Sequence, residues 1–268
     1  MKTDSALKIG LALLAALVVT AVLAPALAPY SPAEQNLSQD LAASSSRHLF
    51  GTDKLGRDVL SRVISGSRIS LAVGATTLAA SLVIGLLLGA LSGFSGGRTD
   101  RLLMRLVDIL MAFPGILLAI ALTAVLGPGL DHVVLALALI GWTGYARLVR
   151  GEILSLREKD FVHAALALGG SPARVIARHI VPNLLPALLI QATFGMAAAI
   201  IAEGSLSFLG LGAEPPTPSW GAMLNEGRQF ILVAPHLTTY PGLAIMFTVL
   251  ALNLTGDGLR DRLEKRGK

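Results

Sequence analysis

Few side chains in this chain have the types and spacing that catalysis requires. No Gly-x-x-x-x-Gly-Lys-Ser/Thr segment occurs, so we predict no loop that binds the phosphates of ATP. Cysteine is absent, which excludes a cysteine nucleophile, a thiolate metal site and a disulfide framework. The segment Gly93-Phe94-Ser95-Gly96 matches the G-x-S-G pattern of an intramembrane serine protease, whose serine must pass its proton to a histidine. Because no histidine lies in the middle of an apolar stretch, a glycine-rich bend explains the segment better.

Carboxylates also stay away from the centres of the apolar stretches. Four acidic residues border them: Asp108, Asp131, Glu203 and Asp257. A proton-coupled transporter usually buries acidic or histidine relays inside its membrane helices. The pattern therefore argues against a proton-driven mechanism, although it leaves a sodium-coupled or facilitative transporter open. Histidines and carboxylates do not cluster, so we predict no metal site and no catalytic residue in this chain.

The composition requires a bilayer as the solvent. Of 268 residues, 53% are apolar and only 15% are charged, whereas soluble domains have about 45–50% and about 25%. This excludes an ordinary cytosolic enzyme, a disordered regulator and a small secreted module. A spanning helix needs about 20 apolar residues. Six stretches lack charged residues and histidine, which predicts an all-α integral membrane protein with six transmembrane helices: 9–28, 69–97, 109–130, 133–146, 180–202 and 237–256.

The fourth stretch has only 14 residues. To cross a membrane it must extend through Leu148 and Val149, or accept Asp131 and His132 at its mouth. The first stretch could be mistaken for a signal peptide, but its apolar run is long and the segment 25–29 begins and ends with proline, which makes a poor cleavage site. We therefore predict that it is retained as a membrane anchor.

The distribution of basic residues sets the predicted orientation. With six spans and the N-terminus inside, sixteen Lys and Arg residues fall inside and six outside. Because cytoplasmic loops carry the excess of positive charge, we expect a multi-pass protein with both termini cytoplasmic. The same rule explains the net charge of +5, so we predict no nucleic-acid partner.

Two long segments lie outside, at 29–68 and 203–236. In the first, Thr52 or Asp53 is expected to cap an amphipathic helix. Its apolar face holds Val59, Leu60, Val63 and Ile64, and its polar face holds Arg57, Asp58, Ser61, Arg62 and Ser65. This helix either rests at the membrane interface or forms a shelf where an external partner docks.

The inner loop 147–182 is much longer than a connector needs to be. Asp160 is expected to cap a short helix, 161–168, which Gly169-Gly170 ends because glycine accepts the left-handed turn. Ser171 then caps a second helix that starts with Pro172 and runs to His179, and Pro182 marks the entry to the fifth span. The first helix presents an apolar face: Phe161, Val162, Ala164, Ala165 and Leu168. The pattern alone fits a docking helix and a membrane-surface helix equally.

Glycine and proline residues occur at several positions within the predicted spans. Gly85, Gly89 and Gly93 form a small-residue stripe, which favours close packing within the chain over a subunit interface. Four prolines are hinges or static kinks: Pro114, Pro182, Pro186 and Pro241. Several polar residues of the spans are candidates for lining a pathway: Thr76, Trp142, Tyr145, Gln191 and Asn253.

Several long motifs, in order along nearly the whole chain, resemble those of a known family. The inner segments DFVHAALALGGS (160–171) and RHIVPN (178–183) resemble the EAA loop of ABC-importer permeases. The outer segment FGTDKLGRDVLSR (50–62) is similar to the dipeptide/oligopeptide/nickel branch, and within it to the second, C-type permease subunit. Further matches are SFLGLG (207–212), PSWG (218–221) and GDGLRD (256–261). His163 replaces the acidic residue that opens the EAA motif, which leaves any salt bridge from this position in question.

The resemblance implies a type I ABC importer permease fold and a transport role without enzymatic activity of its own. It implies two separate ATPase subunits that bind ATP and Mg²⁺, a homologous permease subunit, an external solute-binding protein, and a place in a bacterial inner membrane. No cofactor is expected in this chain. The coupling residues that it implies are Asp160, Phe161, His163, Ala164, Ala165, Gly169, Ser171, Arg174 and Pro182.

The predicted organisation has three regions. Residues 1–68 form an anchor helix and an outer loop with an amphipathic helix, residues 69–257 form the permease core with the coupling loop 147–182, and residues 258–268 form a cytoplasmic basic tail. The leading function is the import of di- or oligopeptides that a binding protein delivers. The alternatives are nickel or glutathione import by the same architecture, and a stand-alone secondary transporter.

Overall fold

The computed structural model describes residues 2–266, and these residues form helices joined by loops, with no β-strand among them. The all-α prediction is confirmed. The helices along the chain are α1 (Lys2–Val22), α2 (Ala24–Leu27), η1 (Leu37–Gln39), α3 (Val59–Ser95), α4 (Gly97–Met111), α5 (Gly115–Leu126), α6 (Leu130–Leu156), α7 (Asp160–Ala167), α8 (Pro172–Val175), η2 (Ile176–Ile180), α9 (Val181–Phe208), α10 (Trp220–Gly227), η3 (Arg228–Phe230) and α11 (His236–Arg266).

Five helical runs are long and apolar enough to cross a membrane: Ser5–Val22, Val59–Ser95, Leu130–Leu156, Pro172–Phe208 and His236–Leu263. The pair α4 and α5 makes a sixth crossing if its two helices, bent by 85°, are counted as one span. Six predicted spans therefore correspond to five continuous runs and one broken run. The predicted basic tail, 258–266 in the described part, continues α11 as a helix, and residues 267–268 lie outside the described residues.

The third span differs from the prediction of one helix over 109–130. The helix that contains Ile109 is α4, which ends at Met111, and the apolar stretch resumes as α5 after Pro114. Proline has no backbone N–H and disfavours helical geometry in the residue before it, so the helix stops here. Pro114 therefore marks a break between α4 and α5, which are bent by 85°.

The fourth span is confirmed and is longer than its charge-free stretch. α6 begins at Leu130, so Asp131 and His132 lie in its first turn, and its 27 residues continue to Leu156. Arg147 Nη2 lies 2.6 Å from Asp108 Oδ1, and Arg150 Nη2 donates to Asp100 Oδ2 at 2.7 Å. Because two carboxylates of α4 pair with these two arginines, α6 continues as a helix past both charged residues.

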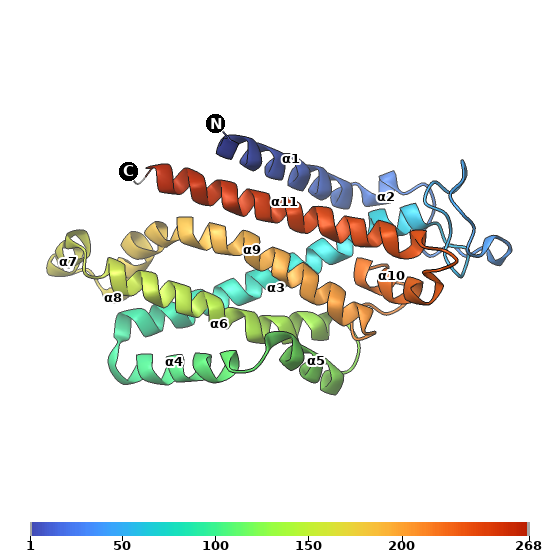
Figure 1. Ribbon diagram of the computed structural model, residues 1–268. Helices are drawn as coiled ribbons and strands as arrows, with labels where there is room; N and C mark the ends of the chain where they lie inside the picture. Colours follow the sequence, from blue (N-terminus) through green and yellow to red (C-terminus); the bar gives the residue numbers. More distant parts are fainter. Residues whose placement is uncertain (1, 267–268) are drawn as a thin grey trace.

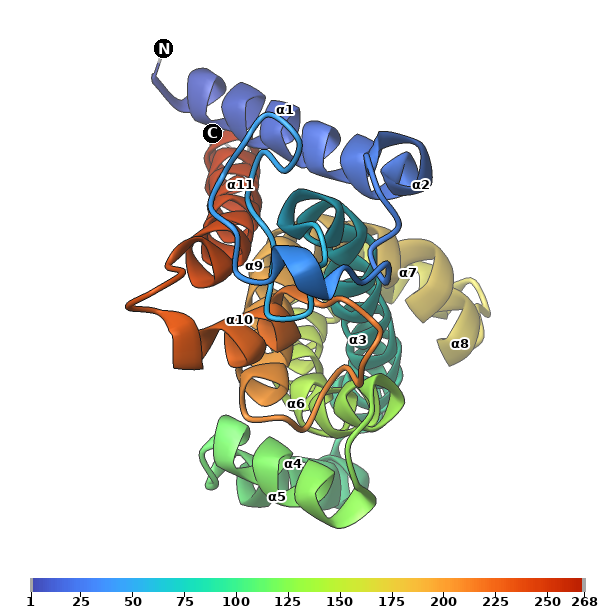
Figure 2. The same cartoon turned by 90° about the vertical axis from the view of Figure 1, so that its right-hand side faces the viewer.

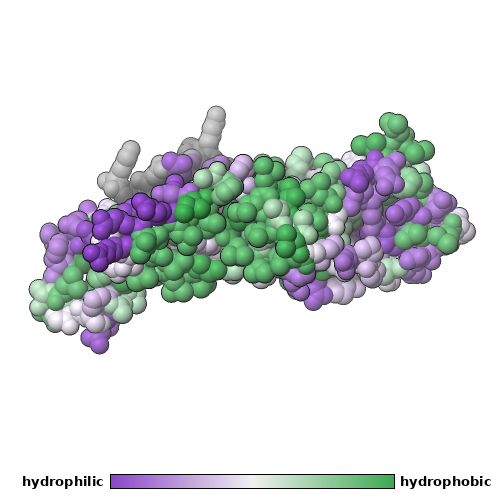
Figure 3. Space-filling view, turned by 90° about the horizontal axis from the view of Figure 1, so that it is seen from below, coloured by the Kyte–Doolittle hydropathy of each residue, from purple (hydrophilic) through white to green (hydrophobic). Residues whose placement is uncertain are grey.

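The long helices lie side by side, with polar structure at both ends of the bundle (Figure 1). α7, α8, the start of α1 and the end of α11 lie at one end, which we call the α7 end. The loop 28–58 and α10 cover the other, which we call the α10 end (Figure 2). Apolar side chains form a band between hydrophilic ends on the face in Figure 3. This is the surface that a membrane protein presents to lipid.

The glycine stripe of α3 packs against α6. A Cβ atom added at Gly89 would lie 2.6 Å from the carbonyl oxygen of Ala146, and one at Gly93 would lie 3.0 Å from Ile153 Cβ. Side chains at these positions would force the two helices apart. The prediction that the stripe packs within the chain is confirmed.

Candidate functional site

The predicted coupling segment forms two short helices at the α7 end. α7 starts at Asp160, but its N-cap is Lys159 and no side chain caps it, so the predicted cap at Asp160 is wrong. The carboxylate of Asp160 lies instead in the first turn, where negative charge favours the helix dipole. Gly169 follows the helix with φ of +84°, and the Gly170 N–H donates to the Ala165 carbonyl at 3.0 Å. The predicted glycine stop is confirmed.

The second half of the segment is continuous with the fifth span. Ser171 Oγ accepts the Arg174 N–H at 3.4 Å, and Pro172 is the first helical residue, as predicted. However, the helix does not restart at Pro182. One helical run extends from Pro172 to Phe208, with a π-helical turn, η2, at Ile176–Ile180. Because Pro182 lacks a backbone N–H, the turn before it cannot close in the ordinary α pattern.

The apolar face of α7 divides between the core and the surface. Val162 is fully buried and Ala165 is half-buried, which corrects the prediction that both are presented outward. Phe161 is 42% exposed and Leu168 is 89% exposed. Of the nine predicted coupling residues, only Ala165 is half-buried. The other eight are exposed: Asp160, Phe161, His163, Ala164, Gly169, Ser171, Arg174 and Pro182.

A buried cluster joins these helices to the spans. Val162 of α7 and Val175 of α8 pack with Ile180 and Leu184, and the cluster continues along α6 through Ile153 to the middle of the bundle. Its full buried membership is Tyr145, Val149, Ile153, Val162, Val175, Ile180, Leu184 and Leu188. Because these side chains are close-packed, a displacement of α7 or α8 is transmitted to α6 and α9.

Four charged residues form a charge quartet at the α10 end: Asp53, Arg57, Arg62 and Glu226. Arg57 Nε lies 2.6 Å from Asp53 Oδ2, and Arg57 Nη2 lies 2.6 Å from Glu226 Oε2. Arg62 lies 3.3 Å from the same Asp53 oxygen and 3.1 Å from the same Glu226 oxygen. Both arginine side chains are 2% exposed. Two cations and two anions thus form a neutral group, in which only the Glu226 side chain is partly exposed, at 21%.

The quartet corrects the prediction of a separate amphipathic helix in the first outer segment. The helix starts at Val59 and is the beginning of the 37-residue α3, with Asp58 as its N-cap in place of Thr52 or Asp53. Arg57 and Arg62 do not form a solvated polar face, because Glu226 of α10 covers them. Glu226 follows Arg62 by 164 positions, and no local pattern pointed to it.

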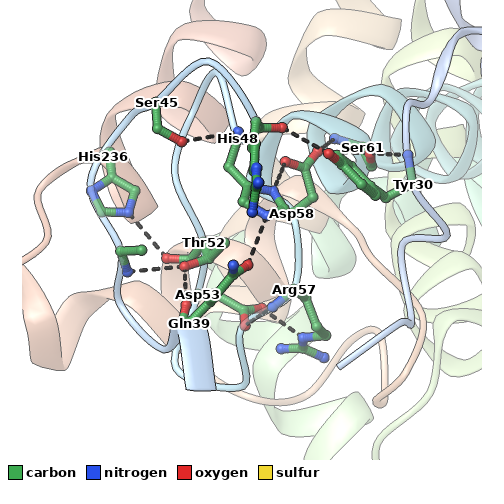
Figure 4. A network of polar contacts seen from close by, with 12 residues as sticks. Tyr30, Gln39, Ser45, His48, Thr52, Asp53, Arg57, Asp58, Ser61 and His236 are labelled. Atoms are coloured by element: carbon green, nitrogen blue, oxygen red, sulfur yellow. Dashed lines mark hydrogen bonds and ion pairs between the residues drawn. The ribbon is translucent and has the colours of Figure 1, made fainter. Parts of the chain in front are cut away.

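A polar network folds the loop before α3 onto the rest of the α10 end (Figure 4). Asp58 Oδ2 accepts the Ser61 N–H at 2.7 Å, and its other oxygen lies 2.9 Å from His48 Nδ1. The Tyr30 N–H donates to Ser61 Oγ at 3.0 Å. His236 Nε2, at the start of α11, lies 3.1 Å from the Thr52 carbonyl. The loop is therefore an ordered lid and not a free connector.

Glu203, which borders the charge-free stretch of the fifth span, is a buried carboxylate. It belongs to α9 and is 1% exposed. Ser207 Oγ donates a hydrogen bond to the Glu203 carboxylate at 2.8 Å, and Ser70 Oγ donates a second one at 3.3 Å. Ser70 Oγ also accepts the Trp220 N–H at 3.3 Å, so Glu203 is part of the contact that seats α10 against α3 and α9. Within residues 5–263 no three His, Asp or Glu side chains gather closely enough to hold a metal ion.

Comparison with known proteins agrees with this arrangement. The family model described as "Binding-protein-dependent transport system inner membrane component" matches residues 85–268. The model described as "N-terminal TM domain of oligopeptide transport permease C" matches residues 2–43. Since the first model covers more than half of the chain, the chain belongs to this family of binding-protein-dependent transport permeases.

Two curated relatives cover almost the whole chain. The dipeptide transport system permease protein DppC of Alkalihalophilus pseudofirmus is 43% identical over 268 residues, which is 100% of this chain and 88% of the relative. The glutathione transport system permease protein GsiD of Escherichia coli O157:H7 is 48% identical over 254 residues, or 94% of this chain and 84% of the relative.

A solved structure shows the same fold. An inward-facing structure of the MetNI methionine ABC transporter superposes with a TM-score of 0.62 at 20% sequence identity, covering 78% of this chain and 97% of that one. The chain is a multi-pass membrane protein with the type I ABC importer permease fold, and the resemblance in the motifs is confirmed.

Proposed function

We propose that this chain is one of two homologous permease subunits of an ATP-driven importer that carries short peptides across a bacterial inner membrane. Two separate ATPase subunits bind ATP and Mg²⁺, and one of them docks on the α7 end, so no cofactor binds to this chain and the chain is no enzyme. A solute-binding protein delivers substrate to the α10 end. Both termini are cytoplasmic. The chain has no phosphate-binding loop, which supports the assignment of ATP hydrolysis to partners.

The observation that carries this proposal is the geometry of the α7 end. Exposed coupling residues flank Gly169, and the buried cluster behind them extends along α6 and α9 into the bundle. A partner that draws the α7 end inward therefore acts on the spans directly. ATP binding to the paired ATPases favours the arrangement that opens outward, and hydrolysis restores the inward-open one. Each step is a population shift driven by differential affinity.

Short peptides are the proposed substrate class. The two relatives described above are named for dipeptide and glutathione transport, and glutathione is itself a short peptide. The described residues offer no metal-binding group of carboxylates or imidazoles, so this chain gives no support to nickel. Within the peptide class, dipeptide and glutathione are the two substrates to compare first.

Purification of the tagged chain in mild detergent from its own membrane tests the proposal. We expect two ATPases with phosphate-binding loops and a second, homologous permease to copurify. The recovered complex should take up dialanine or glutathione into vesicles only when ATP and the binding protein are supplied. A chain that purifies alone, and that moves solute when reconstituted alone, would instead be a secondary transporter, and the importer proposal would be wrong.

A further inference from the structure

Two neighbouring cavities lie on the surface of α3 at the α10 end and just below it. The first, of about 570 Å³, lies between α2, the loop that follows it and the start of α3, and we call it the α2 pocket. The second, of about 560 Å³, lies between α3 and α6, and we call it the α6 groove. Ile69 lines both, so the two cavities meet at this residue.

The α6 groove has a floor of small side chains. On α3, Ala72, Thr76 and Ala80 line it at four-residue spacing, so they lie on one face of the helix. Thr76 Oγ1 donates to the Ala72 carbonyl at 2.7 Å, and its hydroxyl hydrogen is therefore already used. On α6, Leu135 and Leu139 line the groove and are 48% and 47% exposed. The groove thus offers an apolar surface to whatever lies in it.

The groove begins where the apolar part of the span begins. Ile69 is the first residue of the charge-free stretch of α3, and the lining residues on this helix run from Ile69 to Ile84, which is about 22 Å of helix. The hydrocarbon of one bilayer leaflet is about 15 Å deep. A hydrocarbon chain that enters at Ile69 therefore finds apolar contacts through the whole depth of its leaflet.

Unpaired charges of both signs lie at the entrance to the groove. Arg68 and Glu34 line the α2 pocket, and both are exposed. Asp131, in the first turn of α6, is exposed and lines the groove. Among the residues that the structure describes, none forms an ion pair with any of these three side chains. The charge quartet at the same end is fully paired, so Arg68 and Glu34 are the charges that remain to receive a ligand.

We propose that the two cavities hold one molecule of phosphatidylethanolamine, with an acyl chain in the α6 groove and the head group in the α2 pocket. The planar guanidinium of Arg68 matches two oxygens of a phosphate, and the carboxylate of Glu34 accepts N–H groups of the ammonium. Arg68 directly precedes Ile69, which places the phosphate where the acyl chain leaves the groove. The inference is independent of the proposed function, because it requires neither a substrate nor an ATPase.

The same charges select this head group over two others. Phosphatidylglycerol carries a net negative charge, which Glu34 and Asp131 repel. Phosphatidylcholine has no net charge, but its quaternary ammonium has no N–H to donate to Glu34. A membrane helix of a second subunit would also fill the groove, but its apolar surface offers no partner to Arg68 and Glu34. A lipid with a phosphate and a primary ammonium satisfies both.

Photocrosslinking tests the site on the protein purified in mild detergent with the subunits that accompany it. Phosphatidylethanolamine with a diazirine in one acyl chain is added in an equimolar amount and irradiated, and mass spectrometry locates the labelled peptides. We expect label within 69–84 and 130–139. Unlabelled phosphatidylethanolamine should displace the probe at about tenfold lower concentration than phosphatidylglycerol or phosphatidylcholine, because each of these loses a charge-assisted contact.

Two pairs of variants show whether the head group and the acyl chain are both recognised. Arg68→Gln should lower labelling about tenfold, whereas Arg98→Gln, which removes an exposed arginine of α4 outside both cavities, should not. Ala72→Leu fills the floor of the groove and should abolish labelling. Ala75→Leu changes an equally exposed alanine of α3 that does not line the groove, and should leave labelling unchanged. All four positions are exposed, so the fold should tolerate each change.

Three results would overturn the inference. Label spread over all the exposed apolar helices, or displaced equally by the three lipids, would show only the general contact of a membrane protein with its bilayer. Unchanged labelling in Arg68→Gln and Ala72→Leu would place the lipid elsewhere. An unlabelled groove, in a complex that loses its second permease with Ala72→Leu but not with Ala75→Leu, would make it a subunit contact. None of these results affects the proposed function, which uptake and copurification test separately.

Discussion

Arg57 and Arg62 bring two positive charges into the interior of the α10 end, and their positions are tolerable only because Asp53 and Glu226 neutralise them. Asp53 lies four residues before Arg57 and also accepts its N–H at 3.0 Å, so it fixes the turn itself. Glu226 comes from α10 and joins that distant helix to α3. At the scale of single residues, this quartet ties the lid to α3 and α10, beside the polar network of Asp58 and His236.

Replacement of Glu226 by Gln should destabilise the protein, because it leaves two buried guanidinium groups with one carboxylate. Removing one partner from a fully buried pair costs about 3–5 kcal/mol. Glu226 is 21% exposed, so we expect about 1–3 kcal/mol, measured as a lower midpoint of thermal unfolding in detergent.

Asp108→Asn is the matched control for this prediction. It breaks the pair with Arg147, whose two side chains are 51% and 67% exposed, and exposed pairs contribute about 0–1 kcal/mol. Equal midpoints for Glu226→Gln and the unmodified protein would show that the quartet does not stabilise the lid.

At the scale of elements, the short helix α8 and the fifth span are one continuous run from Pro172 to Phe208. The π turn η2 absorbs the missing donor of Pro182 without ending the helix. α7 is attached to this run by Gly169 and Gly170 and by the buried side chain of Val162. The turn at Gly169 therefore sets the orientation of α7 relative to this continuous helical run.

Gly169→Val should uncouple ATP hydrolysis from transport while the complex still assembles. The φ of +84° at this residue costs a β-branched side chain about 1–2 kcal/mol, so α7 would be displaced. We expect a large fall in dipeptide uptake with ATPase activity retained, both measured on the purified complex in vesicles.

Gly169→Asn separates backbone strain from loss of a small residue, because asparagine tolerates the left-handed region. It should retain most of the uptake. Since no atom lies within 4 Å of a Cβ at this position, neither variant introduces a clash within the chain. Unchanged uptake in Gly169→Val would count against the coupling role of this segment.

At the scale of the whole molecule, the bundle has two chemically different ends. The α7 end carries the start of α1, the end of α11 and the short helices α7 and α8, and the α10 end carries the lid (Figure 1). The basic residues are concentrated in the segments of the α7 end, which the positive-inside rule assigns to the cytoplasm.

Single cysteines test this orientation, because the natural chain has none and gives no background. Leu232→Cys lies at a 97% exposed position of the α10 end. It should react with a membrane-impermeant maleimide in intact spheroplasts. Ser171→Cys, exposed at the α7 end, should react only after permeabilisation. The reverse labelling pattern would place the α7 end outside and remove the basis for ATPase docking there.

The sequence by itself determined the membrane class, the all-α fold, the glycine packing of α3, the Gly169 stop and the family. Each depends on composition, on local backbone chemistry or on contiguous motifs. The tertiary structure alone decided that Pro114 breaks a span, that Val162 is an anchor and that Glu203 is buried within α9. It also paired Arg57 and Arg62 with Glu226. These features depend on contacts between helices distant in sequence, and no local pattern records which partner will cover a given side chain.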